Sequence, residues 1–260
     1  LRGQSPANHF PNKPAPLKEV KHGVHHELDD QAQARAIEII RALRPEDNIS
    51  GEEANLPEWI EGRRYCWVLD ALDNTVGYLT GRKDYGVAVV CIDTETGLPI
   101  LAMYYTPEDE KIPGKGGALY YANGSGYFIN GERQYVDLER IDYGNWKALL
   151  TLIPSVGELP FIPVLRERFK FREVINNPAG STIQSCLTPA LDKYEGPMFI
   201  SAKYRPDDFL LTAWFAQSVG MKAVFVNGRP VFPVSTQVFR HRGRLPPFII
   251  TTPSAVQEAL

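Results

Sequence analysis

The chain has 260 residues, of which 43% are hydrophobic and 23% charged, as in ordinary globular proteins. Its formal net charge is -3, from 28 basic and 31 acidic side chains. This balance provides no basic excess for binding a nucleic-acid backbone, so we expect no nucleic-acid partner. No apolar stretch approaches the length of a membrane span, so we expect no membrane contact. A chain of this length can bury a sizeable core.

The three cysteines, Cys66, Cys91 and Cys186, match no zinc spacing and no disulfide framework. Their apolar neighbours favour buried free thiols, which fit a reducing compartment, so the sequence predicts a cytoplasmic protein. The chain opens with Leu1 rather than Met and shows no secretory signal. We therefore expect the natural N-terminus to lie upstream of Leu1.

The first predicted elements are a loop, a helix and a strand. Residues 1–21 contain four prolines and little periodicity, which predicts a loop or a truncated N-terminal arm. Residues 29–43 carry apolar side chains at helical spacing, with acids at the start and Arg41 near the end, and predict a helix. Residues 64–70 form an apolar, aromatic-rich run that predicts a buried strand ending at Asp70.

Further along the chain, strands occur both in hairpins and between helices. Residues 85–93 and 98–105 flank a turn-like TETG and predict a hairpin, and residues 118–136 predict two short strands with a turn at Asn130-Gly131. The remaining predictions are strands at residues 147–153, 198–202, 222–226 and 247–251, and helices at residues 181–190 and 207–219. The sequence therefore predicts mixed layers of helix and sheet.

Three acidic features form the candidate site. Gly51-Glu52-Glu53 is predicted to lie in a loop, Asp70 and Asp73 flank the predicted strand end, and Asp207-Asp208 opens a helix. Hard cations such as Mg²⁺ bind several oxygen ligands, commonly one or two carboxylates with waters and phosphate oxygens. Two aspartates three positions apart can face one ion or bridge two, and the Leu72 carbonyl can add an oxygen. Taken singly, each feature is better explained as a helix cap or a solvated charge.

Taken in order, these segments resemble the inositol monophosphatase family of magnesium-dependent, lithium-sensitive phosphatases. The family pattern is GEE, then a strand ending in W-x-x-D-P-x-D-G-T, then W-D-x-A-A-G with a glycine twelve residues after the aspartate. The segments in register here are residues 51–53, 67–75, 126–132 and 180–182, and Asp208 with Gly220. The likeness extends from about Val24 to the C-terminus.

The resemblance implies a two-metal site. Glu52, Asp70 and the Leu72 carbonyl would bind one Mg²⁺, and Asp70, Asp73 and Asp208 a second, within a site of two or three ions. The hydrolysis would use an activated water and no covalent intermediate.

The resemblance also assigns roles in catalysis and substrate binding. Thr75, together with Glu52, would orient the attacking water. Backbone N–H groups of Asn74 and Thr75 at a helix start would bind the phosphate. The implied catalytic residues are Glu52, Asp70 and Thr75, and the implied phosphate- and substrate-binding residues are Asn74, Thr75, Gly180, Ser181 and Asp208.

The implied fold class is α+β, a layered αβαβα sandwich forming one domain over residues 1–260. Its approximate halves are residues 22–140, with the metal motifs, and residues 141–260, on the substrate side. The implied partner is a small phosphorylated substrate, with inositol monophosphate or a related sugar or polyol phosphate expected first. Relatives hydrolyse histidinol phosphate, fructose bisphosphate or 3′-phosphoadenosine nucleotides, and they often form homodimers.

Several positions depart from the family pattern. Ala71 replaces proline, Asn74 replaces glycine, Asp207 replaces tryptophan, and Leu210-Leu211 replace a small pair. Asn tolerates unusual backbone angles, but its side chain could crowd the phosphate. These changes support an alternative of another class, a family member that binds metal or phosphate with little or no turnover.

Two other features leave alternatives open. Residues 21–26 contain three histidines, for which a solvated turn is favoured over a transition-metal site. Lys203 and Arg205 either face the substrate or form surface ion pairs.

Overall fold

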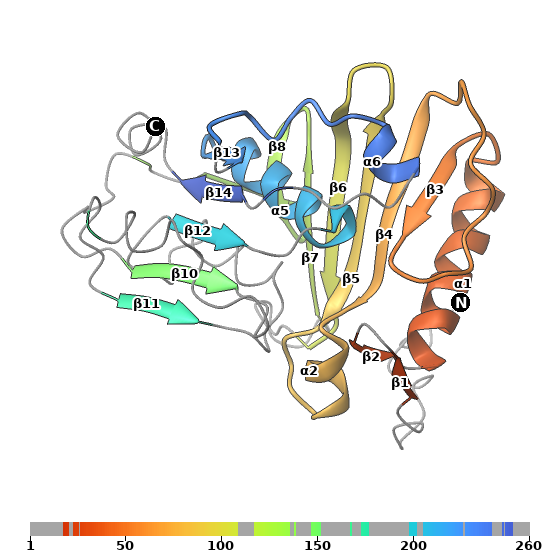
Figure 1. The fold of residues 1–260 in the computed structure, drawn as a ribbon, viewed down its shortest axis with the longest axis horizontal. Coiled ribbons are helices and arrows are strands. Elements are labelled where there is room, and N and C mark those ends of the chain that lie inside the picture. The colour runs from red at the N-terminus through yellow and green to blue at the C-terminus, as the bar shows by residue number, and fades with distance from the viewer. Residues whose placement is uncertain are drawn as a thin grey trace.

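The computed structural model describes residues 18–20, 23–25, 27–108, 117–135, 138, 147–151, 167, 173–176, 198–201, 205–225, 227–240, 246 and 248–251. Figure 1 shows two β-sheets, with helix α5 lying between them and helix α1 beside the larger one. The predicted helix at residues 181–190, Cys186, Gly180 and Ser181 lie outside the described residues, as does the side chain of Asp208.

Within the described part of the chain, the larger sheet has seven strands in the order β3-β4-β5-β6-β7-β8-β9. Strands β3 and β4 are parallel, and every later neighbouring pair is antiparallel. The strands are Asn48–Gly51 (β3), Tyr65–Asp73 (β4), Gly86–Asp93 (β5), Leu98–Thr106 (β6), Ala118–Asn123 (β7), Gly126–Ile129 (β8) and Glu132–Gln134 (β9).

The smaller sheet of the described residues has five strands in the order β11-β10-β12-β14-β13. Strand β10 is parallel to both of its neighbours, whereas β14 is antiparallel to β12 and β13. The strands are Lys147–Thr151 (β10), Glu173–Asn176 (β11), Met198–Ser201 (β12), Lys222–Phe225 (β13) and Phe248–Thr251 (β14).

The remaining elements are helices and a small hairpin. The helices are Glu27–Leu43 (α1), Thr75–Leu79 (α2), Pro206–Ser218 (α5) and Gln237–Arg240 (α6), and the hairpin strands are Lys18–Val20 (β1) and Gly23–His25 (β2). Among the described residues, no helix is both long and apolar enough to cross a membrane.

The side chains of β4 point alternately to two hydrophobic clusters, one on each face of the larger sheet. Cys66 and Val68 belong to the main core, which includes the buried side chains of α5. Leu69 packs instead with Ile49 of β3 and Ile40 of α1. Successive strand residues point to opposite faces, so α1 covers one face and α5 the other.

Helix α5 is apolar around its circumference because it is buried between the two sheets. On one side, the Phe209 ring lies 4.6 Å, centroid to centroid, from Phe248 of β14. On the other side, Phe215 lies 5.2 Å from Tyr127 of β8. Pro206 opens the helix, where its missing N–H leaves no hydrogen bond unmade. The start of α5 is thereby held where the two sheets come together.

The predicted α+β class is confirmed by the layered arrangement of the described helices and sheets. The hairpin of β5 and β6, the first helix and the helix after residue 206 are confirmed to within a few residues. Cys66 and Cys91 are buried free thiols, as predicted. Burial raises the pKa of Cys66, and raises that of Cys91 to about 12, so both stay protonated at neutral pH. The division of the chain into two halves stays a prediction.

Four local predictions are wrong. Residues 18–20 are not loop, because β1 pairs with β2 across a two-residue connection. Residues 118–136 contain three strands, because the chain turns at residues 124–125 as well as at Asn130-Gly131. The strand predicted to end at Asp70 continues to Asp73. Gly51 ends strand β3 rather than lying in a loop.

Strand β3 escapes sequence reasoning because its polar residues are stabilised by distant partners. The Asn48 amide accepts a hydrogen bond from the Ile60 N–H and donates one to the Ile60 carbonyl, both at 2.9 Å. Strand propensity depends on such context more than on the strand's own residues.

The Arg64–Asp93 pair predicts a pH-dependent stability. Burial alone would raise the pKa of Asp93, but hydrogen bonds from Arg64 and from the N–H groups of Thr96 and Glu95 outweigh it and lower this pKa. A lowered folded-state pKa stabilises the fold above about pH 4 and loses that contribution as pH falls through the folded value. The difference in urea unfolding between wild type and Asp93→Asn should therefore be largest near pH 7 and should shrink as the pH falls below about 4. A difference independent of pH would contradict this.

Candidate active site

A bulge in β4 brings the two predicted metal-binding aspartates to the same side of the sheet. Asp70 pairs with Ala88 of β5 and Asp73 with Gly86, so three steps along β4 oppose two along β5. In a regular strand, residues three apart face opposite ways, and the extra residue of a bulge reverses this. Asp70 and Asp73 are 3% and 4% exposed. The strand therefore ends in two buried carboxylates on one face.

Tyr104 lies against Asp73, and Gly86 leaves the space for its ring. The Tyr104 hydroxyl donates a 2.9 Å hydrogen bond to Asp73 Oδ2. A Cβ atom at Gly86 would lie 2.5 Å from Tyr104 Cζ and 2.6 Å from the Tyr105 carbonyl oxygen. Strand β5 thus needs glycine at this position so that a tyrosine from β6 can reach the aspartate. Sequence reasoning missed Tyr104, whose only signal is a polar tip within an apolar strand.

Thr75 connects the end of β4 to helix α1. Its hydroxyl oxygen lies 3.3 Å from the Leu72 carbonyl oxygen and 3.3 Å from Asp29 Oδ1. Asp29 is 4% exposed, and the Leu72 N–H donates to Asp70 Oδ1 at 3.2 Å. The predicted residues Asp70, Leu72, Asp73 and Thr75 are therefore brought together, with Asp29 added.

Asn74 has the backbone conformation for which the family pattern has glycine. Its φ is 64° and its ψ 55°, in the left-handed region that Asn tolerates better than most residues. Its side-chain amide donates to the Asp84 carbonyl at 2.8 Å and accepts from the Gly77 N–H at 3.1 Å. The expected crowding of the phosphate finds no support in these contacts, because the side chain caps α2. The phosphate role of the Asn74 and Thr75 N–H groups stays a prediction.

Gln33 holds the turn that carries Glu52. Its side-chain oxygen accepts a 3.0 Å hydrogen bond from the Glu53 N–H, and the Glu52 N–H donates to the Leu69 carbonyl at 3.2 Å. A Cβ atom at Gly51 would lie 2.7 Å from Gln33 Oε1. Sequence reasoning missed Gln33, although it lies one helical turn after Asp29 on the buried face of α1.

The Glu52 carboxylate is bound by an arginine. Arg205 Nη1 lies 2.9 Å from Glu52 Oε1, and Arg205 Nη2 donates to the Glu52 carbonyl at 2.8 Å. Arg205 Nε lies 3.1 Å from Asp207 Oδ2. Of the two open alternatives for Arg205, the ion pair is thus the one the structure contains.

The donors at this site suit a hard divalent cation by their chemistry, since they are carboxylates and a carbonyl. Burying ionised carboxylates is unfavourable unless positive charge or hydrogen bonds compensate. As the side chains are placed, however, no three His, Cys, Asp or Glu residues among those described form a metal-binding group. Glu52 is turned to Arg205 instead, and the side chain of Asp208 is outside the described set. The donor chemistry therefore suits the cation, and the roles of Glu52, Asp70, Leu72, Asp73 and Asp208 as metal ligands stay a prediction.

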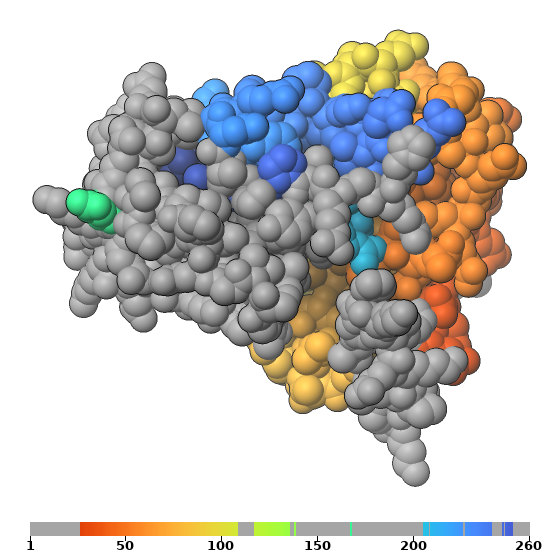
Figure 2. Space-filling view, in the orientation of Figure 1, coloured from red at the N-terminus to blue at the C-terminus, as the bar shows by residue number. Residues whose placement is uncertain are grey.

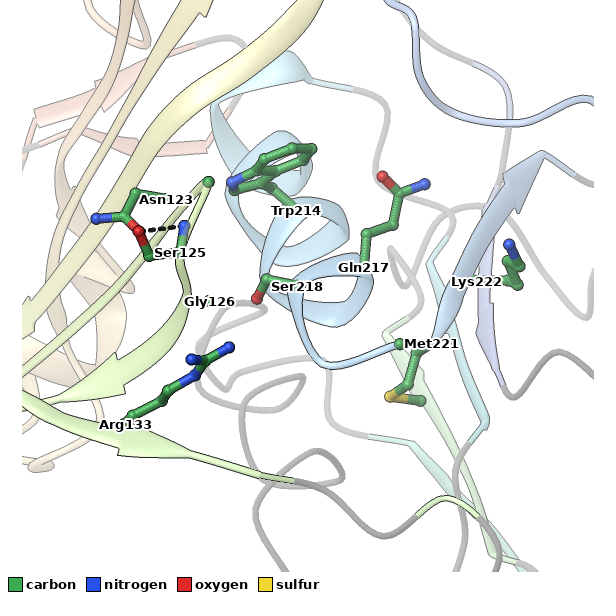
Figure 3. Close-up of a pocket in the computed structure, with 11 residues that line it drawn as sticks. Asn123, Ser125, Gly126, Arg133, Trp214, Gln217, Ser218, Met221 and Lys222 are labelled. Atoms are coloured by element: carbon green, nitrogen blue, oxygen red, sulfur yellow. Dashed lines mark hydrogen bonds between the residues drawn. The ribbon is translucent and has the colours of Figure 1, made fainter.

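A separate cavity of about 580 Å³ lies at the other end of α5, between its last turn and the β7–β8 turn (Figure 3). Its lining includes Trp214 and Ser218 of α5 and Arg133 of β9. In Figure 3 the Arg133 guanidinium extends toward the helix, whereas Lys222 lies on the helix's far side. Among the described residues, the lining of this cavity includes none of the predicted site residues.

The fold and the acidic end of β4 define a class, an α+β protein with two buried carboxylates at the end of an inner strand. The sequence matches the inositol monophosphatase family over residues 10–151, which is more than half of the chain. The chain therefore belongs to the inositol monophosphatase family. The match includes Glu52, Asp70, Leu72, Asp73, Asn74 and Thr75, whereas Gly180, Ser181 and Asp208 lie beyond it.

One curated relative is a fructose-1,6-bisphosphatase/inositol-1-monophosphatase of Thermotoga maritima, 30% identical over 107 residues. The aligned stretch covers 41% of this chain and 37% of that relative, little more than a third of its length.

Two solved structures resemble the whole fold. One is a staphylococcal inositol monophosphatase-1 in a lithium-soaked inhibitory complex, with a TM-score of 0.71, 18% identity, and coverage of 94% of this chain and 85% of that one. The other is an IMPase/NADP phosphatase with Mg²⁺ and phosphate, with a TM-score of 0.69, 19% identity, and coverage of 94% and 85%. At these identities the likeness establishes the fold.

The Tyr104–Asp73 hydrogen bond predicts a stability loss in Tyr104→Phe. Removing the donor withdraws one hydrogen bond from a buried carboxylate, which costs about 1–3 kcal/mol. Urea unfolding of the metal-free protein measures it. Tyr121→Phe is the control, because Tyr121 stacks on Phe128 of the neighbouring strand β8, and that ring contact survives the change. Equal stability of wild type and Tyr104→Phe would contradict the assigned hydrogen bond.

Proposed function

We propose that this protein is a Mg²⁺-dependent phosphatase that hydrolyses a small phosphate monoester. The observation that carries the proposal is the β4 bulge, which turns Asp70 and Asp73 to one side as buried carboxylates. Family membership supports the same reaction class, and the similar structure with Mg²⁺ and phosphate supports a divalent cofactor.

Asp70, Asp73 and the Leu72 carbonyl, with Glu52 and Asp208, would hold the metal ions. Bound Mg²⁺ would supply positive charge for the phosphate and activate a water. We infer a site of two or three ions, as in the predicted two-metal arrangement.

The chain's own residues would prepare the reaction. Thr75 is positioned by Asp29 and the Leu72 carbonyl, and we infer that its hydroxyl orients the attacking water together with Glu52. Gln33 and the β3–β4 pairing fix the backbone that carries Glu52. Gly180, Ser181 and Asp208 remain the proposed substrate-side residues, and the proposed assembly is a homodimer.

The proposed substrate is inositol monophosphate or a related sugar or polyol phosphate. The name of the Thermotoga relative supports inositol 1-phosphate and fructose 1,6-bisphosphate as the first compounds to test. A second candidate function is metal or phosphate binding with little turnover, which is favoured by the Arg205 contact on Glu52. The two are separated by measuring Mg²⁺ binding beside phosphate release, since binding without release supports the second.

Asp70→Asn should lower Mg²⁺-dependent phosphate release from the best substrate by at least about 100-fold. Lost outer-shell partners already cost 10–100-fold, and Asp70 is proposed to touch two ions. The assay is inorganic phosphate release from inositol 1-phosphate, fructose 1,6-bisphosphate, histidinol phosphate and 3′-phosphoadenosine 5′-phosphate, with Mg²⁺ or with EDTA.

Asp93→Asn is the matched control, because Asp93 is also a buried aspartate of this sheet but pairs with Arg64. It should keep its activity at neutral pH. Equal phosphate release by Asp70→Asn and wild type, or phosphate release that EDTA leaves unchanged, would contradict the proposal.

A further inference from the structure

Arg205 binds the side chain of Glu52, a predicted metal ligand. Arg205 itself lies beyond the residues that match the family. Its guanidinium contacts both Oε1 and the backbone carbonyl of Glu52, at 2.9 and 2.8 Å. The third nitrogen, Nε, lies 3.1 Å from Asp207 Oδ2, an ion-pair contact that is not a hydrogen bond. The guanidinium thus donates two hydrogen bonds to Glu52 and forms an ion pair with the Asp207 carboxylate.

The start of α5 explains how Arg205 reaches Glu52. Arg205 precedes the helix in an extended conformation, with φ -89° and ψ 137°, and Pro206 begins the helix. Figure 2 shows cyan atoms from the start of α5 lying against the orange surface of the segment that includes β3 and β4. The packing of α5 between the sheets therefore fixes where the guanidinium lies.

Asp207 anchors the arginine. Its side chain is 7% exposed, whereas Arg205 and Glu52 are 43% and 35% exposed. A buried carboxylate needs compensating charge more than an exposed one, so the Asp207 contact is the less replaceable of the two. Asp207 also stands where the family pattern has tryptophan, so this anchor is a departure of this chain from that pattern.

A cation on Glu52 and a metal ion on Glu52 compete. Glu52 Oε1 accepts from Arg205, and a divalent ion needs the same carboxylate for coordination. Two cations a few ångströms apart also repel each other in a partly buried setting. The free energy of metal binding at Glu52 therefore includes the cost of displacing the Arg205 guanidinium from this carboxylate.

We propose that Arg205, anchored by Asp207, is a built-in counter-cation that positions Glu52 in the metal-free protein and weakens Mg²⁺ binding at the Glu52 side of the site. Arg205 is a positioning residue in this role, since it acts through Glu52. The inference rests on the proposed metal-dependent function.

The test is isothermal titration of each full-length protein with MgCl₂ alone, without substrate. The informative variants are Arg205→Gln and the double variant Arg205→Gln/Asp207→Asn, which keeps the net charge and leaves no buried aspartate without the guanidinium. Arg64→Gln is the matched control, because it breaks an arginine–aspartate pair of similar exposure at the opposite end of β4.

We expect both Arg205 variants to bind Mg²⁺ with a Kd about 10-fold lower than wild type, which is about 1.4 kcal/mol. Their metal-free melting temperatures should fall, and added Mg²⁺ should raise the double variant's melting temperature more than that of wild type. Arg64→Gln should show the wild-type Kd.

Two different results would contradict the counter-cation role of Arg205, and only one of them would also contradict the proposed metal-dependent function. An unchanged or higher Kd in both Arg205 variants, with wild type still binding Mg²⁺, would overturn the counter-cation role alone. If neither wild type nor the double variant binds Mg²⁺, both the proposed metal-dependent function and this inference are wrong.

Discussion

The arrangement of the candidate site depends on the burial of Asp70 and Asp73 at one bulge of β4. Carboxylates removed from water must be stabilised by hydrogen bonds or positive charge. The surrounding chain serves this requirement: Tyr104 donates to Asp73, and the Leu72 N–H donates to Asp70. Gly86 leaves the space through which the tyrosine reaches. The need to stabilise two buried carboxylates thus explains the contacts made by Leu72 of β4 and Tyr104 of β6, and the glycine at position 86 of β5.

Helix α5 connects this strand end to the rest of the protein. It is apolar on every side because both sheets pack against it, and this packing fixes the position of its first residues. The packing of the hydrophobic core therefore places Arg205 against Glu52, and Asp207 forms an ion pair with the same arginine. Core packing and site electrostatics are coupled through one helix.

Strong local patterns predicted much of the fold. The 3.6-residue period of α1 and the apolar runs of β5 and β6 are visible without their partners, and the structure contains them. Strand β3 was missed because its polar Asn48 is paired with Ile60, twelve residues away. The β4 bulge was missed as well, because register shifts arise from pairing with β5 and leave no mark on the β4 residues themselves.

By itself, the sequence determined which oxygen donors are available and their order along the chain: Glu52, then Asp70, Leu72 and Asp73, since the residue types and spacings are written there. Only the tertiary structure decided how they lie. The bulge turned Asp70 and Asp73 to one face, and Arg205, 153 positions away, was placed on Glu52. Contacts over such separations depend on sheet pairing and helix packing, which no local pattern of residues specifies.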